Sequence, residues 1–188
     1  MSSITAVEKI AMFEKELELI FDKDIREFTK LCLMAAPDYI FNDCPASSSG
    51  KYHPVGELCA SGNIDHSKKV FTVAYELCRG LGVENHRDQV CSASLIHDLV
   101  KQGWKKSGHT VKHHPKLAAE LVDQVQEMSQ LLSEEDYNII RGCTGYHYGV
   151  WGSGEWVKPL SSYTFEELTV YISDYIASKR FIEVDYKR

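Results

Sequence analysis

The sequence has no long apolar run, no signal-like N-terminus and no closely spaced pair of cysteines. No stretch of 18 apolar residues occurs among the 188, so no membrane-spanning helix is expected. No basic segment followed by an apolar one begins the chain, so no secretory signal is predicted and a cytoplasmic location is expected. The six cysteines include no Cys-x-x-Cys motif, which argues against a zinc ribbon or a redox site and predicts buried thiols.

An excess of positive charge is also missing. Lys and Arg number 21 against 27 Asp and Glu, the formal net charge is −6, and no block of five like charges occurs. A dedicated nucleic-acid-binding protein needs a basic face for its phosphate contacts, so that class is disfavoured. Apolar residues at 44% and charged residues at 26% are typical of a globular chain, and the length predicts a single domain over residues 1–188.

Apolar residues recur at steps of three and four along most of the chain, and only the short stretches 139–140 and 181–184 are strand-like. This periodicity predicts an all-α fold. Residues 1–36 are expected to form an N-terminal helical extension, one long helix or two in line, followed by a long loop over residues 42–63. Five further helices are expected: from Asp65 to Gly80, from Arg87 to Lys101, from Pro115, from Ser133 to near Gly142, and from Thr164.

Three of these helices carry a metal-ligand type of side chain on a face that should be buried. His66 lies on an apolar stripe of its helix, and the adjacent His97 and Asp98 lie near the edge of the apolar face of the next. Asp174 belongs to an otherwise uncharged stripe of the last helix. A buried carboxylate is costly unless it is paired or bound to a metal.

Two interpretations of these four residues are open. Two imidazoles and two carboxylates converging from three helices would form a mixed nitrogen and oxygen site for a divalent cation, with positions left for water or substrate. Alternatively, His66 is a hydrogen-bonded core histidine, Asp174 pairs with a nearby Lys or Arg, and the adjacency of His97 and Asp98 is chance.

The ordered set of a single His, the pair His97-Asp98 and the distant Asp174 resembles the HD-domain superfamily of metal-dependent phosphohydrolases. The resemblance runs from Lys51 to Ser178 and implies a compact HD-domain helical bundle with its core over residues 51–178. It also implies a bound divalent metal ion, one of Mn, Co, Zn, Fe, Ni or Mg, and binuclear members hold a second ion. The implied ligands are His66, His97, Asp98 and Asp174.

The loop before the first ligand adds to the resemblance. Ser47-Ser48-Ser49-Gly50-Lys51-Tyr52-His53-Pro54 is similar to a segment of small, often phage-encoded HD proteins. Those proteins have Gly-Gly-Leu and His-Thr further on, where this chain has Gly56-Glu57-Leu58 and His66-Ser67. A phage-encoded protein of this kind would work in the cytoplasm of its host.

The resemblance implies hydrolysis of a phosphate ester by a metal-activated water, and it suggests catalytic roles for three residues. Asp98 is a ligand or the residue that orients the water, and Lys101 neutralises phosphate charge. His114, just before Pro115, contacts the substrate or protonates the leaving group. It also resembles, with His147, the places where binuclear members add ligands for a second ion.

Loop residues are the candidates for substrate binding. Lys51 and His53 could meet phosphate, and a nucleobase could stack on one or two of the loop aromatics, among them Tyr52 and Trp104. His147 is included as a further candidate contact. For most of the loop aromatics the alternative is that their rings cover the core.

These observations favour a hydrolase of a nucleotide or a similar small phosphorylated metabolite. A deoxynucleoside triphosphate hydrolase is the first choice, and a nucleoside monophosphatase or cyclic-nucleotide phosphodiesterase is the alternative. A hypothesis of another class is a non-catalytic HD-like module that holds a nucleotide. The expected partner is a small phosphorylated substrate, with no membrane and no dedicated nucleic-acid binding. A homo-oligomer stays open, because the N-terminal extension could pack on a neighbouring copy.

Overall fold

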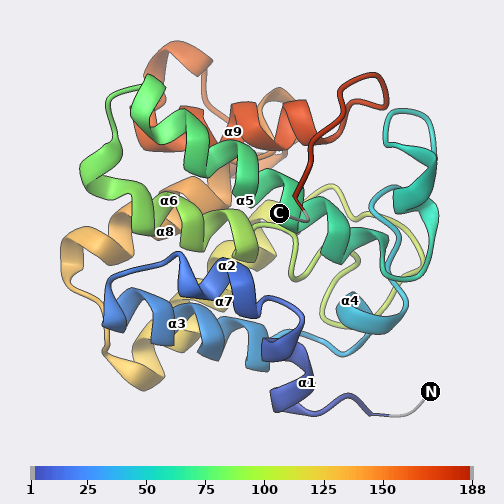
Figure 1. Ribbon diagram of the computed structural model, residues 1–188, viewed down its shortest axis with the longest axis horizontal. Coiled ribbons are helices and arrows are strands. Elements are labelled where there is room, and N and C mark those ends of the chain that lie inside the picture. Colours follow the sequence, from blue (N-terminus) through green and yellow to red (C-terminus); the bar gives the residue numbers. More distant parts are fainter. Residues whose placement is uncertain (1–2, 187–188) are drawn as a thin grey trace.

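Helix α6 (Arg87–Ile96) lies at the centre of the molecule, with the other long helices packed around it (Figure 1). Residues 89–96 are all buried, and the small side chains at 91–94 allow neighbouring helices to approach closely. The helices that pack directly on α6 are α3 (Lys23–Ala35), α5 (Gly62–Gly80), α8 (Glu134–Tyr146) and α9 (Phe165–Ala177), and α7 (His114–Ser129) packs on α3 and α8.

The computed structural model describes residues 3–186, and it confirms the all-α prediction for that part of the chain, where no strand occurs. Residues 139–140 lie inside α8, and residues 181–184 form a turn and an irregular segment. No helix within residues 3–186 has the length and apolar character to cross a bilayer. Five of the cysteines are buried as predicted, whereas Cys59 is exposed in the loop before α5.

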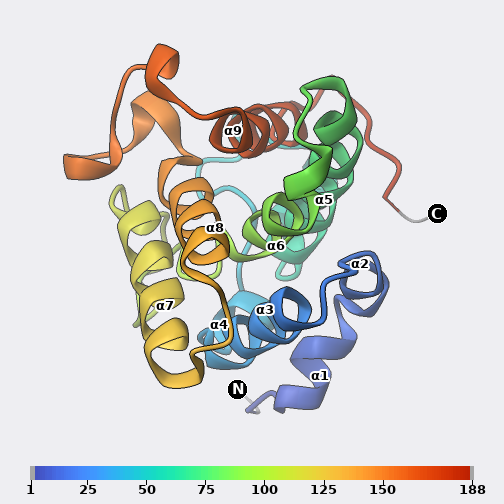
Figure 2. The same cartoon turned by 90° about the vertical axis from the view of Figure 1, so that its left-hand side faces the viewer.

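The N-terminal extension consists of three separate helices, so the expectation of one long helix or two in line is wrong. Helix α1 (Ala6–Ala11), α2 (Glu14–Glu18) and α3 lie on the opposite side of the bundle from α9 (Figure 2). The backbone leaves helical geometry at Phe13, whose fully buried ring is thereby turned into the core. Asp22 then caps α3 by accepting hydrogen bonds from backbone N–H groups two and three residues on, at 2.9 and 3.0 Å.

The predicted loop after α4 (Tyr39–Asn42) is held in place by its own backbone. Ala46 N donates a hydrogen bond to Glu57 O at 2.9 Å, which draws the two sides of the loop together. Helix α5 begins at Gly62, earlier than the predicted Asp65. A Cβ at Gly62 would lie 1.8 Å from the carbonyl oxygen of Glu57, so only glycine fits at this close approach.

Helix α6 ends just before His97, and the chain does not continue as a helix to Lys101 as predicted. Lys101 N donates to the carbonyl three residues earlier at 3.2 Å, which marks a tight turn. The hydroxyl of Tyr39 accepts a hydrogen bond from Gln102 N at 3.0 Å and donates to Gly103 O at 2.7 Å. These bonds fix the turn that carries the His-Asp pair.

The predicted starts of the last three helices are confirmed. Helix α7 has Pro115 in its first turn, and Ser133 Oγ caps α8 by accepting from Asp136 N at 3.1 Å. Thr164 and Glu167 form the full capping box at the start of α9, with bonds of 3.2 and 2.8 Å. Helix α8 runs on to Tyr146 instead of ending near Gly142.

The packing of α3 predicts a large stability difference between two phenylalanines of the extension. Phe28 is 0% exposed, whereas Phe21 is 60% exposed. Phe28→Ala should lower the free energy of unfolding by about 3–5 kcal/mol, because it leaves a cavity in the core. Phe21→Ala should cost less than about 1 kcal/mol, since it removes only a cation–π contact with Arg87. Denaturant unfolding of both variants measures this, and equal losses would contradict the described packing.

Candidate metal centre and substrate cavity

Four ligand-type side chains meet in the interior of the bundle. His66 Nε2 lies 2.9 Å from Asp174 Oδ1 and 3.9 Å from Asp98 Oδ2. His97 Nε2 lies 3.4 Å from the same oxygen of Asp98. Donor atoms that share one ion at about 2.1 Å are themselves about 3.0–3.4 Å apart. The structure therefore brings His66, His97 and Asp98 close enough to share a divalent ion, and it places Asp174 directly against His66.

The helix packing explains why these residues meet. Helices α5 and α9 pack against each other, so that His66 near the start of α5 faces Asp174 near the end of α9. The His97-Asp98 pair follows α6, which packs against both helices. Asn63, in the first turn of α5, donates a hydrogen bond to Asp98 O at 3.4 Å. The tight turn is thereby tied to the helix that carries His66.

Asp98 also faces a second group of histidines. Its Oδ1 lies 3.2 Å from His114 Nε2 and 3.8 Å from His147 Nε2. His114 is the first residue of α7, His147 directly follows α8, and both are buried. The two oxygens of one buried carboxylate thus face two separate sets of imidazole nitrogens.

Hydrogen bonds determine which ring nitrogen each of these histidines turns toward Asp98. The Nδ1 atoms of His97, His114 and His147 lie 2.7, 2.8 and 2.6 Å from carbonyl oxygens three residues earlier. A carbonyl oxygen only accepts, so each Nδ1 carries a proton, and whenever one of these rings is neutral its lone pair is on Nε2. His114 Nε2 and His147 Nε2 are 3.1 Å apart. Two lone pairs this close require a proton or a cation beside them.

The donor atoms fit a divalent cation. The buried Nε2 of His97 has no hydrogen-bond partner, which is costly for a polar atom shielded from water. An ion held by the group would accept that lone pair and those of His114 and His147. Mixed imidazole and carboxylate sets suit Mn, Fe, Co, Ni or Zn.

Asp98 is held in its charged form. Burial alone would raise its pKa, but the positive charges of Lys101 and His97 outweigh burial and hold the pKa of Asp98 well below its usual range. Lys101 Nζ lies 2.5 Å from Asp98 Oδ2 and is itself buried. The attraction of Asp98 outweighs burial for Lys101 too, and raises the pKa of its ammonium group.

The other charges at the centre also suit metal binding. Burial would raise the pKa of Asp174, but its hydrogen bond with His66 lowers that pKa overall. Burial lowers the pKa of His66 to about 4 and that of His147 to about 3. At neutral pH the carboxylates are charged and these two imidazoles neutral, which are the protonation states that metal ligands need.

A cavity of about 480 Å³ opens beside Asp98. Its polar lining includes the two aspartates, Lys101, His114 and His147, together with serines 47–49. One wall is aromatic and consists of Tyr52, Tyr148, Trp151, Tyr171 and Tyr175. This volume is within the range of small-molecule sites.

The predicted substrate residues divide into two groups. Tyr52, His53 and His147 line the cavity. Lys51 and Trp104 do not line it, so their assignment as substrate contacts has no support from the structure. Lys51 is exposed beside the ring of Tyr52, and Trp104 lies 38% exposed in the segment after the His-Asp turn. Both assignments relied on loop position, which does not determine where a side chain points.

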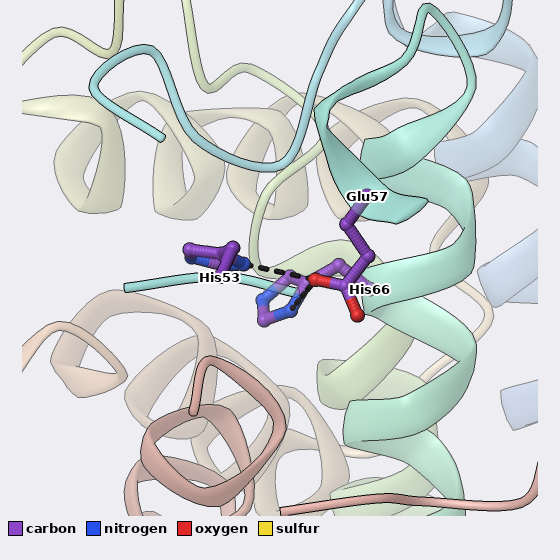
Figure 3. A group of neighbouring side chains, drawn as sticks. All are labelled: His53, Glu57 and His66. Carbon is purple, nitrogen blue, oxygen red and sulfur yellow. Dashed lines mark hydrogen bonds and ion pairs between the residues drawn. The ribbon is translucent and has the colours of Figure 1, made fainter. Parts of the chain in front are cut away.

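Glu57 is a site residue that the sequence did not indicate. It belongs to η1 (Val55–Leu58), is 2% exposed, and lies between His53 and His66 (Figure 3). It stands where the resembled segment has a glycine, so the resemblance suggested no role for it. Its burial depends on the loop geometry, and no sequence periodicity reports on that.

A second missed group lies on α9 and directly after it. Tyr171, Tyr175 and Lys179 follow one another at steps of four, so they share a face, and all three line the cavity. Lys179 Nζ lies 3.8 Å from the ring centroid of Tyr175. The Trp151 ring stacks near both tyrosines, at interplanar angles of 23° and 13°. Their four-residue spacing in the sequence could have indicated that these three side chains lie on one face of the helix.

The lowered pKa values predict an acid sensitivity of the metal-stripped protein. The folded pKa of His147, about 3, lies below its unfolded value near 6.5, so the unfolded state takes up a proton first as the pH falls. Its contribution to stability is therefore complete above pH 6.5 and is lost between pH 6.5 and 3. The same sign holds for His66, while the raised pKa of His97 acts in the opposite direction.

His147→Gln should accordingly flatten the fall of unfolding free energy between pH 6.5 and 4, by up to about 1.4 kcal/mol per pH unit. Denaturant titrations at several pH values measure this. The matched control is the exposed His113→Gln, which should leave the slope unchanged. A His147→Gln slope equal to that of wild type would show that this ring is not neutral in the folded state.

Comparisons with known proteins identify a family for this chain. The HD domain family matches residues 63–179, which is more than half of the chain and includes the His66, His97-Asp98 and Asp174 positions. A search of curated proteins and a search of solved structures each find no match. HD domains are typically metal-dependent phosphohydrolases, and the clustered histidines and aspartates fit a divalent metal ion. The chain belongs to the HD-domain family.

Proposed function

We propose that this protein is a metal-dependent phosphohydrolase that acts on a nucleotide. The observation that carries the proposal is the shared carboxylate of Asp98, which faces two sets of buried imidazole nitrogens and borders an open cavity. Membership of the HD-domain family supports the phosphate chemistry.

His66, His97, Asp98 and Asp174 would hold the first ion. Asp98, His114 and His147 would hold a second ion. The Nε2 atoms of the two histidines face each other, and a cation between them would bind both lone pairs. This contact favours the role of second-ion ligands for His114 and His147 over the predicted substrate contacts. The donor chemistry allows Mn, Co, Zn, Fe, Ni or Mg.

When bound, a divalent ion of this kind lowers the pKa of a coordinated water and polarises a phosphoryl oxygen. Asp98 would hold that ion and orient the attacking water through its charged oxygens. Lys101, which lines the cavity, offsets phosphate charge, and its ion pair with Asp98 keeps it protonated. Lys179, beside the ring of Tyr175, supplies a second positive charge to the cavity.

The aromatic wall supports a nucleotide over a simple phosphate ester. Trp151, Tyr171 and Tyr175 offer flat faces next to the phosphate-directed residues, and base stacking on such rings tolerates different bases. Within this class we put a deoxynucleoside triphosphate first. A nucleoside monophosphate or a cyclic nucleotide is the alternative.

Replacing the shared carboxylate tests the catalytic proposal. Asp98→Ala should abolish phosphate or pyrophosphate release from nucleotides, by roughly 10³-fold or more, because a metal ion contributes several kcal/mol to such a reaction. The assay is a nucleotide panel with Mn, Co, Mg and Zn, and circular dichroism checks that the helical fold remains.

Two results would contradict the proposal. Activity that persists unchanged in a folded Asp98→Ala protein would place the chemistry elsewhere. No turnover of any nucleotide by the wild type with any of these metals, despite nucleotide binding, would favour the non-catalytic module.

The aromatic wall has its own test. Trp151→Ala should raise KM for the nucleotide about 5- to 100-fold, which corresponds to the loss of one stacking contact, and should change kcat little. Trp104→Ala is the matched control and should change neither, since Trp104 does not line the cavity. A raised KM for Trp104→Ala with a normal KM for Trp151→Ala would restore the assignment made from the sequence.

A further inference from the structure

The buried carboxylate of Glu57 faces the Nδ1 atom of the His66 ring, whereas Asp174 faces its Nε2 atom (Figure 3 shows Glu57 and His66). Its Oε2 lies 2.9 Å from His53 Nδ1 and 3.9 Å from His66 Nδ1. Its Oε1 lies 2.5 Å from Lys69 Nζ. The same oxygen of Glu57 thus contacts His53 and faces His66 Nδ1.

The two ring nitrogens of His66 have different surroundings. His66 Nε2 lies 2.9 Å from Asp174 Oδ1, and because an ionised carboxylate only accepts, this contact places the ring proton on Nε2. His66 Nδ1 is buried and has no hydrogen-bond partner. The ring itself is fully buried, so this nitrogen has no access to bulk water.

Binding of an ion at Nε2 requires the other tautomer of His66. A metal takes the Nε2 lone pair, so the proton must lie on Nδ1, and this N–H then needs an acceptor. Glu57 Oε2 is 3.9 Å away, about 1 Å beyond an ordinary N–H···O bond. A carboxylate oxygen accepts two hydrogen bonds, so it can keep the one from His53.

We propose that Glu57 is the positioning carboxylate of the metal centre: it accepts a hydrogen bond from His66 Nδ1 when Nε2 of that ring binds the divalent ion. The inference rests on the proposed metal site and adds a residue outside its ligand set. It also links His53, which lines the cavity, to a metal ligand through one shared carboxylate.

A purely structural role is the alternative for Glu57. The Lys69 contact alone could account for burial of the carboxylate, as an ion pair that ties η1 to α5. That role predicts a loss of stability on substitution and no effect on metal binding. Metal affinity separates the two, because the His66 contact uses Oε2 and the Lys69 contact uses Oε1.

The test is the dissociation constant for Zn²⁺ and Mn²⁺, measured by chelator competition on metal-stripped full-length protein. Glu57→Gln keeps the volume and removes the charge, and it should weaken metal binding about 10- to 100-fold, as for other partners of metal-bound histidines. Lys69→Met is the matched control, and it should bind metal like wild type even if its thermal stability falls. Unchanged affinity in Glu57→Gln, with tight binding by wild type, would overturn the inference.

A measurement on wild type keeps the inference testable if Glu57→Gln does not fold. Nitrogen-15 NMR of the zinc-loaded protein should show a proton on His66 Nδ1, engaged in a hydrogen bond, and none on Nε2. A Nδ1 without a proton, or a proton on Nδ1 without a hydrogen bond, would overturn it. Wild type that binds neither metal would instead remove the proposed metal site, and this inference with it.

Discussion

The carboxylate of Asp98 is the group on which the interior of this protein depends. It is 2% exposed, and five positively charged or imidazole side chains surround it: His66, His97, His114, His147 and Lys101. A buried charge is tolerated only when such partners replace its hydration. The charge of Asp98 is therefore the feature around which the polar groups at the centre of the bundle are arranged.

Helix packing and hydrogen bonds hold Asp98 in a fixed position. Small residues along α6 let four helices approach it, and the tight turn that follows carries the His-Asp pair to their common junction. Tyr39 and Asn63 hold the turn by hydrogen bonds from two other elements. The cost is a core with several unsatisfied polar atoms, His97 Nε2 among them. A bound divalent ion would give His97 Nε2 a partner, so the residues proposed for function are also residues that affect stability.

Much of this arrangement was predictable where helical periodicity reports on it. The inward positions of His66 and Asp174 follow from stripes on α5 and α9, and the structure does bring them together with His97 and Asp98; their role as ligands remains a prediction. The division of the N-terminal extension into separate helices was missed because the apolar periodicity continues across Phe13. Asp22 is of a residue type that commonly caps helices, and it caps α3. Glu57 was missed, and the position of Trp104 outside the cavity was not foreseen, because loop side chains are directed by tertiary contacts, which local sequence does not contain.

Anomalous diffraction from crystals soaked with Mn²⁺ tests the central claim most directly. The account predicts a peak within about 2.0–2.3 Å of His66 Nε2, His97 Nε2 and oxygens of Asp98 and Asp174. A second, partly occupied peak is expected on the His114 side of Asp98. No peak at Asp98, or a peak bound only by surface carboxylates at the same soaking concentration, would contradict the account.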